Sequence, residues 1–372
     1  MTKKIRIAIL YNEPTSGSVQ MRKYVAENGQ LKEGPPRRKV ARQTKQPMGP
    51  NAIDLSEIGV MEEMEDIKTA LTDLGYKPTV MNVDGDVYRL IDYLRDEKPD
   101  LIFNLVECVE NESEQEMNVA GLYELLKIPY TGAPSFTLGT LLHKARVKEI
   151  LTYHDIKTPR FQLFDVADKI STNGHLTFPL IVKPSREDAS VGIDDDSVVY
   201  TLNDLKKRVR HIIQKFEQPA LVEEYIKGRE LNVAILGNKP PVVLPISEID
   251  FSGLTDGMHH IVSYAAKWMH GTVEYEGTKG ICPAPLPASV EAKVKDIALR
   301  CYTILGCRDY ARVDLRLTKD YVPYVLEVNP NPDISDEAGF ARSARAYGLE
   351  FSDTIGRIVE VALERTRADQ RL

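Results

Sequence analysis

Apolar and polar residues alternate in two stretches near the end of the chain, as they do in half-buried β-strands. The first stretch covers residues 311–317 and the second covers residues 322–333, with a polar turn at residues 318–320 between them. The pattern predicts a β-hairpin. Pro330 and Pro332 end the second strand, because proline has no N–H group to donate to a neighbouring strand.

The polar face of this predicted hairpin gathers three oxygen-bearing side chains. Asp314 on the first strand, and Glu327 and Asn329 on the second, fall at alternating positions that can share one face. Two carboxylates and an amide oxygen suit Mg²⁺, which keeps few protein ligands and completes its shell with water and phosphate oxygens. From the spacing alone, an amphipathic hairpin with a solvated polar face is the simpler interpretation.

Strand-like and helix-like patterns alternate through the first 105 residues. This β-α-β-α-β rhythm predicts a small parallel sheet with right-handed crossovers. We expect strands at residues 5–10, 78–83 and 101–105, and helices at residues 58–74 and 87–94. Residues 128–132 are expected to form a crossing strand and turn.

The polar residues that follow two of these strands are candidates for binding a ligand, because parallel sheets bind ligands at the carboxyl ends of their strands. They are Asn12, Glu13, Asn104 and Glu107. Most of the acidic run at residues 107–116 fits a solvated first helical turn, where the helix dipole favours negative charge. Glu107, at a strand end, is the candidate ligand for a cationic amine.

Residues 22–45 differ from their surroundings in charge and in pattern. They hold eight Lys or Arg against two Glu, a net charge of +6, and show almost no apolar periodicity. We interpret residues 22–50 as a solvated, mobile insertion in the N-terminal domain. The alternative is a loop that attracts an acidic substrate or partner.

Further strands and helices follow, and two loops among them stand out. An apolar strand at residues 178–183 ends at Lys183 before a loop of small residues; this suits phosphate binding, although a surface lysine before a turn is commoner. Residues 252–285, with Lys267 and Trp268, are mostly loop, and such length is typical of a functional element. We also expect strands at residues 160–164 and 242–249, a strand–turn–strand unit at 220–233, and helices at 138–144, 145–153, 294–304 and 355–362.

Composition places the chain among soluble globular proteins. Its 372 residues predict two or three domains, and 42% hydrophobic with 28% charged residues argues against global disorder. No apolar run approaches the ~20 residues of a membrane span, and a net charge of −7 gives no reason to expect nucleic-acid binding. The chain starts directly with a strand rather than a secretory signal. Four cysteines without metal-binding spacing predict buried, reduced thiols in a cytoplasmic protein: Cys108, Cys282, Cys301 and Cys307.

From about Ile128 onward the sequence resembles the ATP-grasp ligases, and most closely their D-alanine–D-alanine ligase branch. Many pieces match in one order: Lys144, residues 181–187 and 190–192, residues 222–225, Glu230, residues 266–268, residues 312–314 and residues 326–329. The resemblance implies an α/β fold, α+β in its C-terminal half, in which a small parallel-sheet substrate domain precedes the ATP-grasp. The implied domains are residues 1–132, a central lid at residues 133–222, and a C-terminal domain with the Mg²⁺ site at residues 223–372.

The resemblance also implies a reaction, in which ATP converts a carboxylate to an acylphosphate that an amine then attacks. Residues implied to bind ATP phosphates are Lys144, Lys183, Ser190 and Lys267. Those implied to bind the adenosine are Glu223, Glu224, Tyr225, Ile226 and Glu230. Arg312 would stabilise the acylphosphate and the oxyanion, with Lys267 as its catalytic partner at the γ-phosphate. Two Mg²⁺ ions, or Mn²⁺ in their place, would be bound by Asp314, Glu327 and Asn329.

Positions that contact D-alanine in the resembling branch carry other residues here. Ala189 and Trp268 replace a serine and a tyrosine, and Asp333 replaces an oxyanion-binding glycine. Each lost polar partner costs about 1–3 kcal/mol. We therefore expect substrates other than two D-alanines, in a pocket lined by Glu13, Glu107, Trp268 and Asp333.

The leading hypothesis is an ATP- and Mg²⁺-dependent ligase that forms an amide or peptide bond between a small carboxylate and an amine, such as amino acids or a peptide. We expect neither nucleic acid nor a membrane as a partner. The alternatives are a D-alanine–D-alanine ligase with an atypical site, an inactive nucleotide-binding scaffold with the basic segment as its partner-binding element, and an enzyme that phosphorylates a hydroxyl. Homodimers are usual in the resembling branch, so a homodimer is possible.

Overall fold

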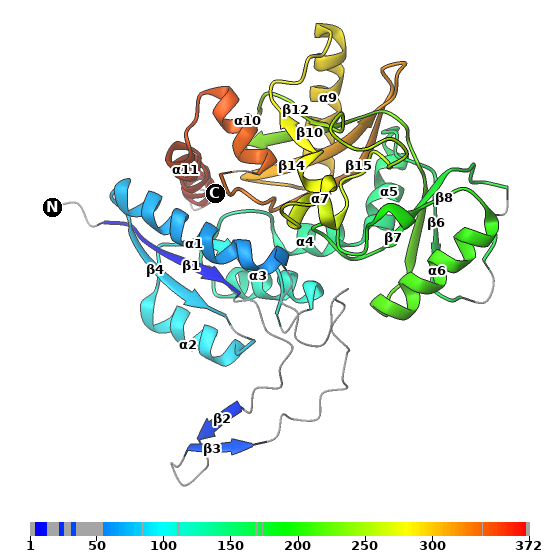
Figure 1. The fold of residues 1–372 in the computed structure, drawn as a ribbon. Coiled ribbons are helices and arrows are strands. Elements are labelled where there is room, and N and C mark those ends of the chain that lie inside the picture. Colours follow the sequence, from blue (N-terminus) through cyan, green and yellow to red (C-terminus); the bar gives the residue numbers. More distant parts are fainter. Residues whose placement is uncertain are drawn as a thin grey trace.

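The computed structural model describes residues 4–12, 22–25, 31–34, 55–83, 85–109, 112–167, 170–172, 174–336 and 338–369. Besides a two-stranded hairpin in the basic segment, three larger sheets organise the described part, and they follow one another along the chain (Figure 1). Helices cover each of them. Glu13 and most of the basic 22–50 segment lie outside the described residues.

The N-terminal sheet is parallel, as predicted. Its strand order is β4-β1-β5, with β1 (Arg6–Tyr11) between β4 (Lys77–Asn82) and β5 (Leu101–Leu105). The helices are α1 (Leu55–Asp73), α2 (Val87–Glu97), the 3₁₀ turn η1 (Ser113–Gln115) and α3 (Glu116–Leu125). The central strand is fully buried from Ile7 to Leu10, because helices pack on both faces of the sheet.

Two segments of the N-terminal region differ from the sequence-based expectation. Residues 128–132 form a single bridge between Tyr130 and Ile102 rather than a strand, and Pro129 has no N–H group to extend it. In the basic segment, β2 (Arg22–Val25) and β3 (Leu31–Gly34) pair as an antiparallel hairpin that the sequence pattern did not predict.

The middle sheet is antiparallel, with the strand order β6-β9-β7-β8. Its strands are β6 (Phe161–Phe164), β7 (Leu180–Pro184), β8 (Val198–Val199) and β9 (Ala220–Glu224), preceded by α4 (Ser135–Leu142) and α5 (Lys144–Tyr153). After the short turn η2 (Asp195–Ser197), helix α6 (Leu202–Phe216) packs its buried face, with Leu205, Val209 and Ile212, in the same core as Val182 and Val222 of the sheet. This core contains only residues of the middle unit, so we refer to residues 161–224 as the lid.

The C-terminal sheet has six strands, in the order β13-β12-β10-β14-β15, with β11 beside β10. The strands are β10 (Arg229–Leu236), β11 (Val242–Val243), β12 (Ser247–Asp250), β13 (Lys279–Ile281), β14 (Tyr310–Leu317) and β15 (Pro323–Asn329). Its helices are α7 (Tyr264–Trp268), α8 (Val273–Glu276), α9 (Ala288–Ile304), α10 (Gly339–Tyr347) and α11 (Phe351–Asp369). The predicted single strand at 242–249 is wrong: β11 and β12 are separate, and Pro245 lies between them.

The N-terminal and C-terminal sheets share one hydrophobic core, whereas the lid has its own. Ile9 and Phe103 of the first sheet belong to the same core as Leu236 of β10 and Ile355 and Val359 of α11. The predicted strand–turn–strand unit at 220–233 is the crossing point between lid and C-terminal sheet, because β9 and β10 pair in different sheets. The lid is therefore connected to the rest by two chain segments, one before β6 and one after β9, and by specific contacts such as that between Lys148 and Glu223.

Gly132 lies at a crowded junction between the N-terminal region and the C-terminal sheet. Its φ is +89°, and its amide donates to Oδ2 of the fully buried Asp309 at 3.1 Å. A Cβ atom at this position would lie 2.3 Å from Oδ1 of Asn331.

We expect Gly132→Ala to lower the free energy of unfolding by more than ~2 kcal/mol, because it combines a strained positive φ with a clash at Asn331. Gly257→Ala is the matched control: its φ of +93° is similar, and no atom lies within 4 Å of the added Cβ. Urea unfolding of both variants measures the difference. Equal losses in the two variants would show that the contact at Asn331 yields without cost.

Candidate active site

The predicted hairpin forms, and its polar face is ordered around one carboxylate. Strands β14 and β15 pair so that Asp314 lies opposite Glu327, and Arg312 opposite Asn329. Asp314 is 5% exposed and accepts hydrogen bonds from Nε and Nη2 of Arg312, at 2.8 and 2.9 Å, and from the amides of Asn232 and Asn329, at 2.7 and 2.9 Å. Four donors from three adjacent strands therefore fix this carboxylate.

Lys144, the first residue of α5, faces this hairpin. Its ammonium nitrogen lies 2.6 Å from Oδ1 of Asp188, 2.7 Å from the carbonyl oxygen of Glu187 and 4.0 Å from Oε2 of Glu327. Burial alone would raise the pKa of Glu327, but the charges of Lys144 and Lys183 outweigh burial and hold this pKa below its ordinary value. The hairpin thus presents an anionic Glu327 to a cationic neighbour.

The loop after β7, residues 185–194, borders these lysines, and we call it the phosphate loop after its predicted role. Ala189 and Ser190 both have positive φ, of 54° and 62°, a backbone form that can turn successive N–H groups toward an anion. The loop, Lys144, Lys183 and Glu327 line a cavity of about 30 Å³. The structure therefore brings together two of the three predicted phosphate-binding lysines, Lys144 and Lys183, with Ser190 and one predicted metal ligand.

Glu223 and Glu230, predicted to bind the adenosine, are both buried and paired with cations. Glu223 is 1% exposed, and its two oxygens lie 2.8 Å from Nζ of Lys148 and 3.1 Å from Nζ of Lys183. Glu230 pairs with Arg316 at 2.7 Å, although burial raises the pKa of Glu230 despite this partner. Glu223 lies near the end of β9 and Glu230 near the start of β10, on either side of the turn that connects the two strands.

The residues between these two glutamates are held in different ways. The Glu224 side chain pairs with Arg160 at 2.5 Å. Tyr225 donates its hydroxyl to the carbonyl oxygen of His260 at 3.2 Å, and Ile226 is half-buried.

Lys267 and Trp268 lie at the end of the short helix α7. The Lys267 ammonium group lies 4.9 Å from the centre of the Trp268 ring, and the indole N–H donates to the carbonyl oxygen of Ala189 at 3.0 Å. Lys267 also helps to lower the pKa of Glu327. Trp268 therefore fastens the phosphate loop to the helix that carries Lys267.

The predicted substrate residues Glu107 and Asp333 belong to a group of carboxylates between the N-terminal and C-terminal sheets. Burial is the largest cause that raises the pKa of Glu63, followed by the charges of Asp333 and Glu107. The pKa of Glu116 is likewise raised by burial first and by Glu107 next. Glu107 itself is exposed at the end of β5, and Asp333 accepts from the backbone and hydroxyl of Ser335 at 2.9 and 2.6 Å. We call Glu63, Glu107, Glu116 and Asp333 the acidic cluster.

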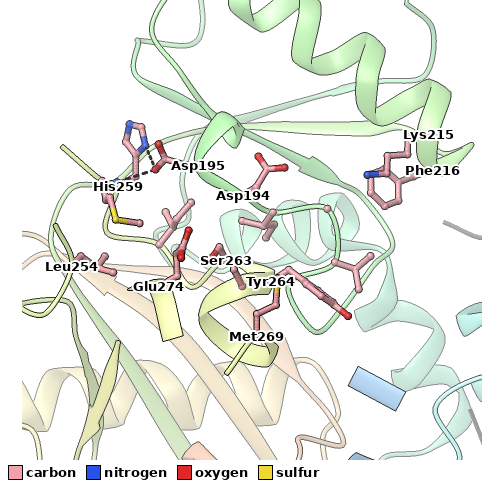
Figure 2. Close-up of a pocket in the computed structure, with 16 residues that line it drawn as sticks. Asp194, Asp195, Lys215, Phe216, Leu254, His259, Ser263, Tyr264, Met269 and Glu274 are labelled. Atoms are coloured by element: carbon pink, nitrogen blue, oxygen red, sulfur yellow. Dashed lines mark hydrogen bonds and ion pairs between the residues drawn. The ribbon is translucent and has the colours of Figure 1, made fainter. Parts of the chain in front are cut away.

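A larger cavity, of about 210 Å³, lies on the other side of the phosphate loop, between the lid and the 252–278 segment (Figure 2). It shares Val191 and Ile193 with the small cavity but is not lined by Lys144 or Lys183, which are predicted to bind phosphate. The amide of Tyr264 donates to the carbonyl oxygen of Ile193 at 3.0 Å across this seam, and His259 pairs with Asp195 at 2.7 Å. These contacts hold the lid against α7.

Four residues of the site were missed from the sequence. Asn232 could have been found, because it alternates with Glu230 on β10 and so shares its face. Lys148 follows Lys144 by one helical turn, a spacing that places both on one side of α5. Nothing in the local pattern separates Glu63 and Glu116 from solvated acids beside them.

Comparison with known proteins gives a consistent result. Residues 150–360 match the family model described as D-ala D-ala ligase C-terminus. An uncharacterized protein, y4sG of Sinorhizobium fredii, is 33% identical over 267 residues, 71% of this chain and 75% of its own. The D-alanine–D-alanine ligase of Desulforudis audaxviator is 31% identical over 300 residues, 80% of this chain and 91% of its own. The crystal structure of D-alanine–D-alanine ligase from Bacillus anthracis complexed with ATP superposes with a TM-score of 0.70 at 22% identity, and covers 98% of this chain and 99% of its own.

The superposition and the three-sheet arrangement define the fold as an ATP-grasp with an N-terminal parallel-sheet domain, as the sequence predicted. The chain belongs to the D-alanine–D-alanine ligase family. It is therefore an ATP-dependent ligase that forms carbon–nitrogen bonds, which favours an enzyme over an inactive scaffold. None of the helices in the described ranges has the length and apolar character that crossing a membrane requires.

Proposed function

We propose that this protein joins a small carboxylate to an amine through an acylphosphate, with ATP and Mg²⁺, and that its substrates are not two D-alanines. The amine would bind as its ammonium ion, release a proton to solvent and attack as the neutral amine. The observation that carries this proposal is the placement of Glu327: it lies beside Asp314 on the hairpin and 4.0 Å from the ammonium group of Lys144. A phosphoryl group bound beside Lys144 and Glu327 would meet positive charge from the ammonium group of Lys144 and from a metal ion held by Glu327.

The metal-binding proposal is supported by the donor set of the hairpin. The described residues contain no group of three or more His, Cys, Asp and Glu side chains that could bind a metal by themselves. Mg²⁺ needs only one or two carboxylates when phosphate oxygens and water complete its shell. Asp314 and Glu327 would supply these, and Asn329, which donates to Asp314 through its amide nitrogen, would supply its carbonyl oxygen. Bound Mg²⁺ would neutralise charge on the transferring phosphoryl group.

The protein's own residues would perform the remaining tasks. Lys144, Lys183 and the loop with Ser190 would bind the phosphates of ATP, and Lys267 would approach the γ-phosphate when it leaves the face of Trp268. Glu223 and the backbone of residues 224–226 would hold adenine, and Glu230 the ribose. Arg312 would stabilise the oxyanion that forms when the amine attacks the acylphosphate. The use of two ions, the acceptance of Mn²⁺, the predicted domain boundaries and a homodimer stay predictions.

The acidic cluster supports an amine that binds as an ammonium ion as the second substrate. Burial and the charges of Asp333 and Glu107 raise the pKa of Glu63, so Glu63 favours its protonated form, and the negative charge that would attract an ammonium group is that of Asp333 and Glu107. The same charge would repel a substrate carboxylate.

The experiment that tests the proposed function measures ADP and phosphate release with ATP, Mg²⁺ and a matrix of amino acids, diamines and D-alanine. We expect release that depends on both a carboxylate and an amine, with basic amines as the better acceptors, and mass spectrometry should find an amide. Phosphate release that needs neither substrate, or a phosphoester product, would refute it. The names of the curated relatives favour a second candidate, D-alanyl-D-alanine synthesis. It would be supported if D-alanine alone sustains turnover.

The acidic cluster also predicts that stability depends on pH through Glu116. Because the pKa of Glu116 is raised in the folded state, the fold favours the protonated carboxyl group. The stability that this protonated group contributes is present at low pH and is lost as the pH rises through the folded-state pKa of Glu116. Glu116→Gln remains neutral and can still accept from Asn331, which donates to Glu116 at 3.1 Å. We expect a higher thermal midpoint than wild type at about pH 8 and a gap that closes toward about pH 5. Glu62→Gln, on the exposed side of α1, is the control, and a midpoint difference independent of pH would contradict the assignment.

A further inference from the structure

Lys148 is a buried cation whose role the proposed function leaves open. It lies on α5, is 1% exposed and is among the largest fully buried side chains. Its ammonium group lies 2.8 Å from Oε1 of Glu223, 2.8 Å from Oγ1 of Thr158 and 3.2 Å from the carbonyl oxygen of Leu326. These partners belong to the lid strand β9, the segment before β6 and the metal hairpin. Lys148 therefore links the lid to the strand that carries Glu327.

Glu223 has two cationic partners, and only one of them faces the nucleotide site. Lys183 lines the cavity at the phosphate loop, whereas Lys148 does not. The described charged groups that face Glu223 are Lys183 from β7 and Lys148 from α5; the adjacent strand β6 contributes the apolar Phe161. Glu223 is 1% exposed, so water cannot replace either lysine as a partner of the carboxylate.

We propose that Lys148 is a positioning residue: it is the permanent counter-ion that keeps Glu223 ionised and in place when Lys183 turns from Glu223 to the phosphates of ATP. A buried carboxylate that loses its last partner either bears a desolvation cost of several kcal/mol or takes up a proton. With two lysines, one can leave and the remaining pair is still neutral. The second lysine thus removes the electrostatic cost of exchanging Lys183 between Glu223 and the nucleotide.

This inference rests on the proposed role of Lys183 in ATP binding, and it predicts a distinctive proton balance. In Lys148→Met, Lys183 still pairs with Glu223 in the free protein, so the fold should persist. Binding of ATP then withdraws the only cationic partner of Glu223, and because adenine brings no positive charge, a proton must neutralise the carboxylate instead. ATP binding should therefore weaken as pH rises, by up to about tenfold per pH unit, although binding to wild type shows no such additional dependence.

The test is calorimetric titration with MgATP, without other substrates, at about pH 6.5 and about pH 8.5 in buffers that differ in ionisation enthalpy. We expect Lys148→Met to take up close to one proton per ATP more than wild type does. The double variant Lys148→Met/Glu223→Gln should lose this uptake, because no carboxylate remains to protonate. Arg146→Met, an equal loss of charge on the exposed side of the same helix, should behave as wild type.

Two results would overturn the inference, and they differ from failure of the proposed function. Lys148→Met that binds ATP with the proton balance of wild type refutes the counter-ion role, as does uptake that persists in the double variant. If circular dichroism shows that Lys148→Met does not fold, Lys148→Gln keeps a hydrogen-bond donor without the charge and is expected to give the same uptake. Wild type that binds no ATP would refute the proposed function itself, and the inference with it.

Discussion

Asp314→Asn is expected to reduce the turnover number by about a thousandfold or more, which corresponds to about 4 kcal/mol of lost transition-state stabilisation. The amide has the shape of the carboxylate but lacks its charge, so it is a poor ligand for Mg²⁺. It also leaves the Arg312 guanidinium, which donates to both oxygens of Asp314, facing a neutral group. Turnover is measured as ADP release, and the thermal midpoint is measured on the same samples.

The matched control for this variant is Asp320→Asn, at the exposed turn of the same hairpin. It removes the same charge from the same element, and we expect activity within about twofold of wild type and an unchanged midpoint. A loss of ~1–3 kcal/mol in stability is expected only for Asp314→Asn, because Asp314 is buried among four donors. Near wild-type turnover of a folded Asp314→Asn would show that the metal lies elsewhere.

The hairpin could be predicted from sequence because its information is local. The period of two at residues 311–317 determines which side chains share a face, and the turn at 318–320 sets the register as far as Leu315. A bulge between Leu315 and Asp314, which the local pattern does not reveal, then sets Asp314 opposite Glu327. The N-terminal parallel sheet was predictable for the same reason, since each element there carries its own period. The break between β11 and β12 was missed because Val242 to Ile249 is nearly continuous in apolar character, and one proline decided the outcome.

Pairings between distant segments could not be predicted from local pattern. Lys148 and Glu223 are 75 positions apart, and only packing of α5 against the lid sheet brings their charges within 2.8 Å. The role of Glu116 also depends on distant segments. It belongs to an acidic run that fits a solvated helix start, yet it accepts a hydrogen bond from Asn331, and its pKa is raised by burial and by the charge of Glu107. Local charge patterns show where charge is, but burial decides whether it titrates normally.

Helix α7 is attached to the phosphate loop at two points. The indole N–H of Trp268 donates to the carbonyl oxygen of Ala189, and the amide of Tyr264 donates to that of Ile193. Lys267 lies between Tyr264 and Trp268 in sequence, so these contacts also hold the backbone that carries Lys267. The lid and the hairpin pack in separate cores.

Arg312→Lys is the second variant expected to have a large effect, and it should separate catalysis from nucleotide binding. Arg312 holds Asp314 through two parallel hydrogen bonds, a geometry that the single ammonium group of lysine cannot reproduce. We expect the turnover number to fall about a hundredfold to a thousandfold, while the Kd for ATP changes less than about threefold, because the charge that ATP meets is kept.

Arg229→Lys is the matched control, since Arg229 makes the same forked contact with Glu248, at 2.6 and 2.5 Å, at the start of β10. Its replacement should reduce stability slightly and leave the turnover number within about twofold. Steady-state kinetics and equilibrium ATP binding of both variants decide between the roles. If Arg312→Lys weakens ATP binding as much as it slows turnover, Arg312 serves the bound nucleotide; a fall in turnover alone assigns it to the oxyanion that forms when the amine attacks.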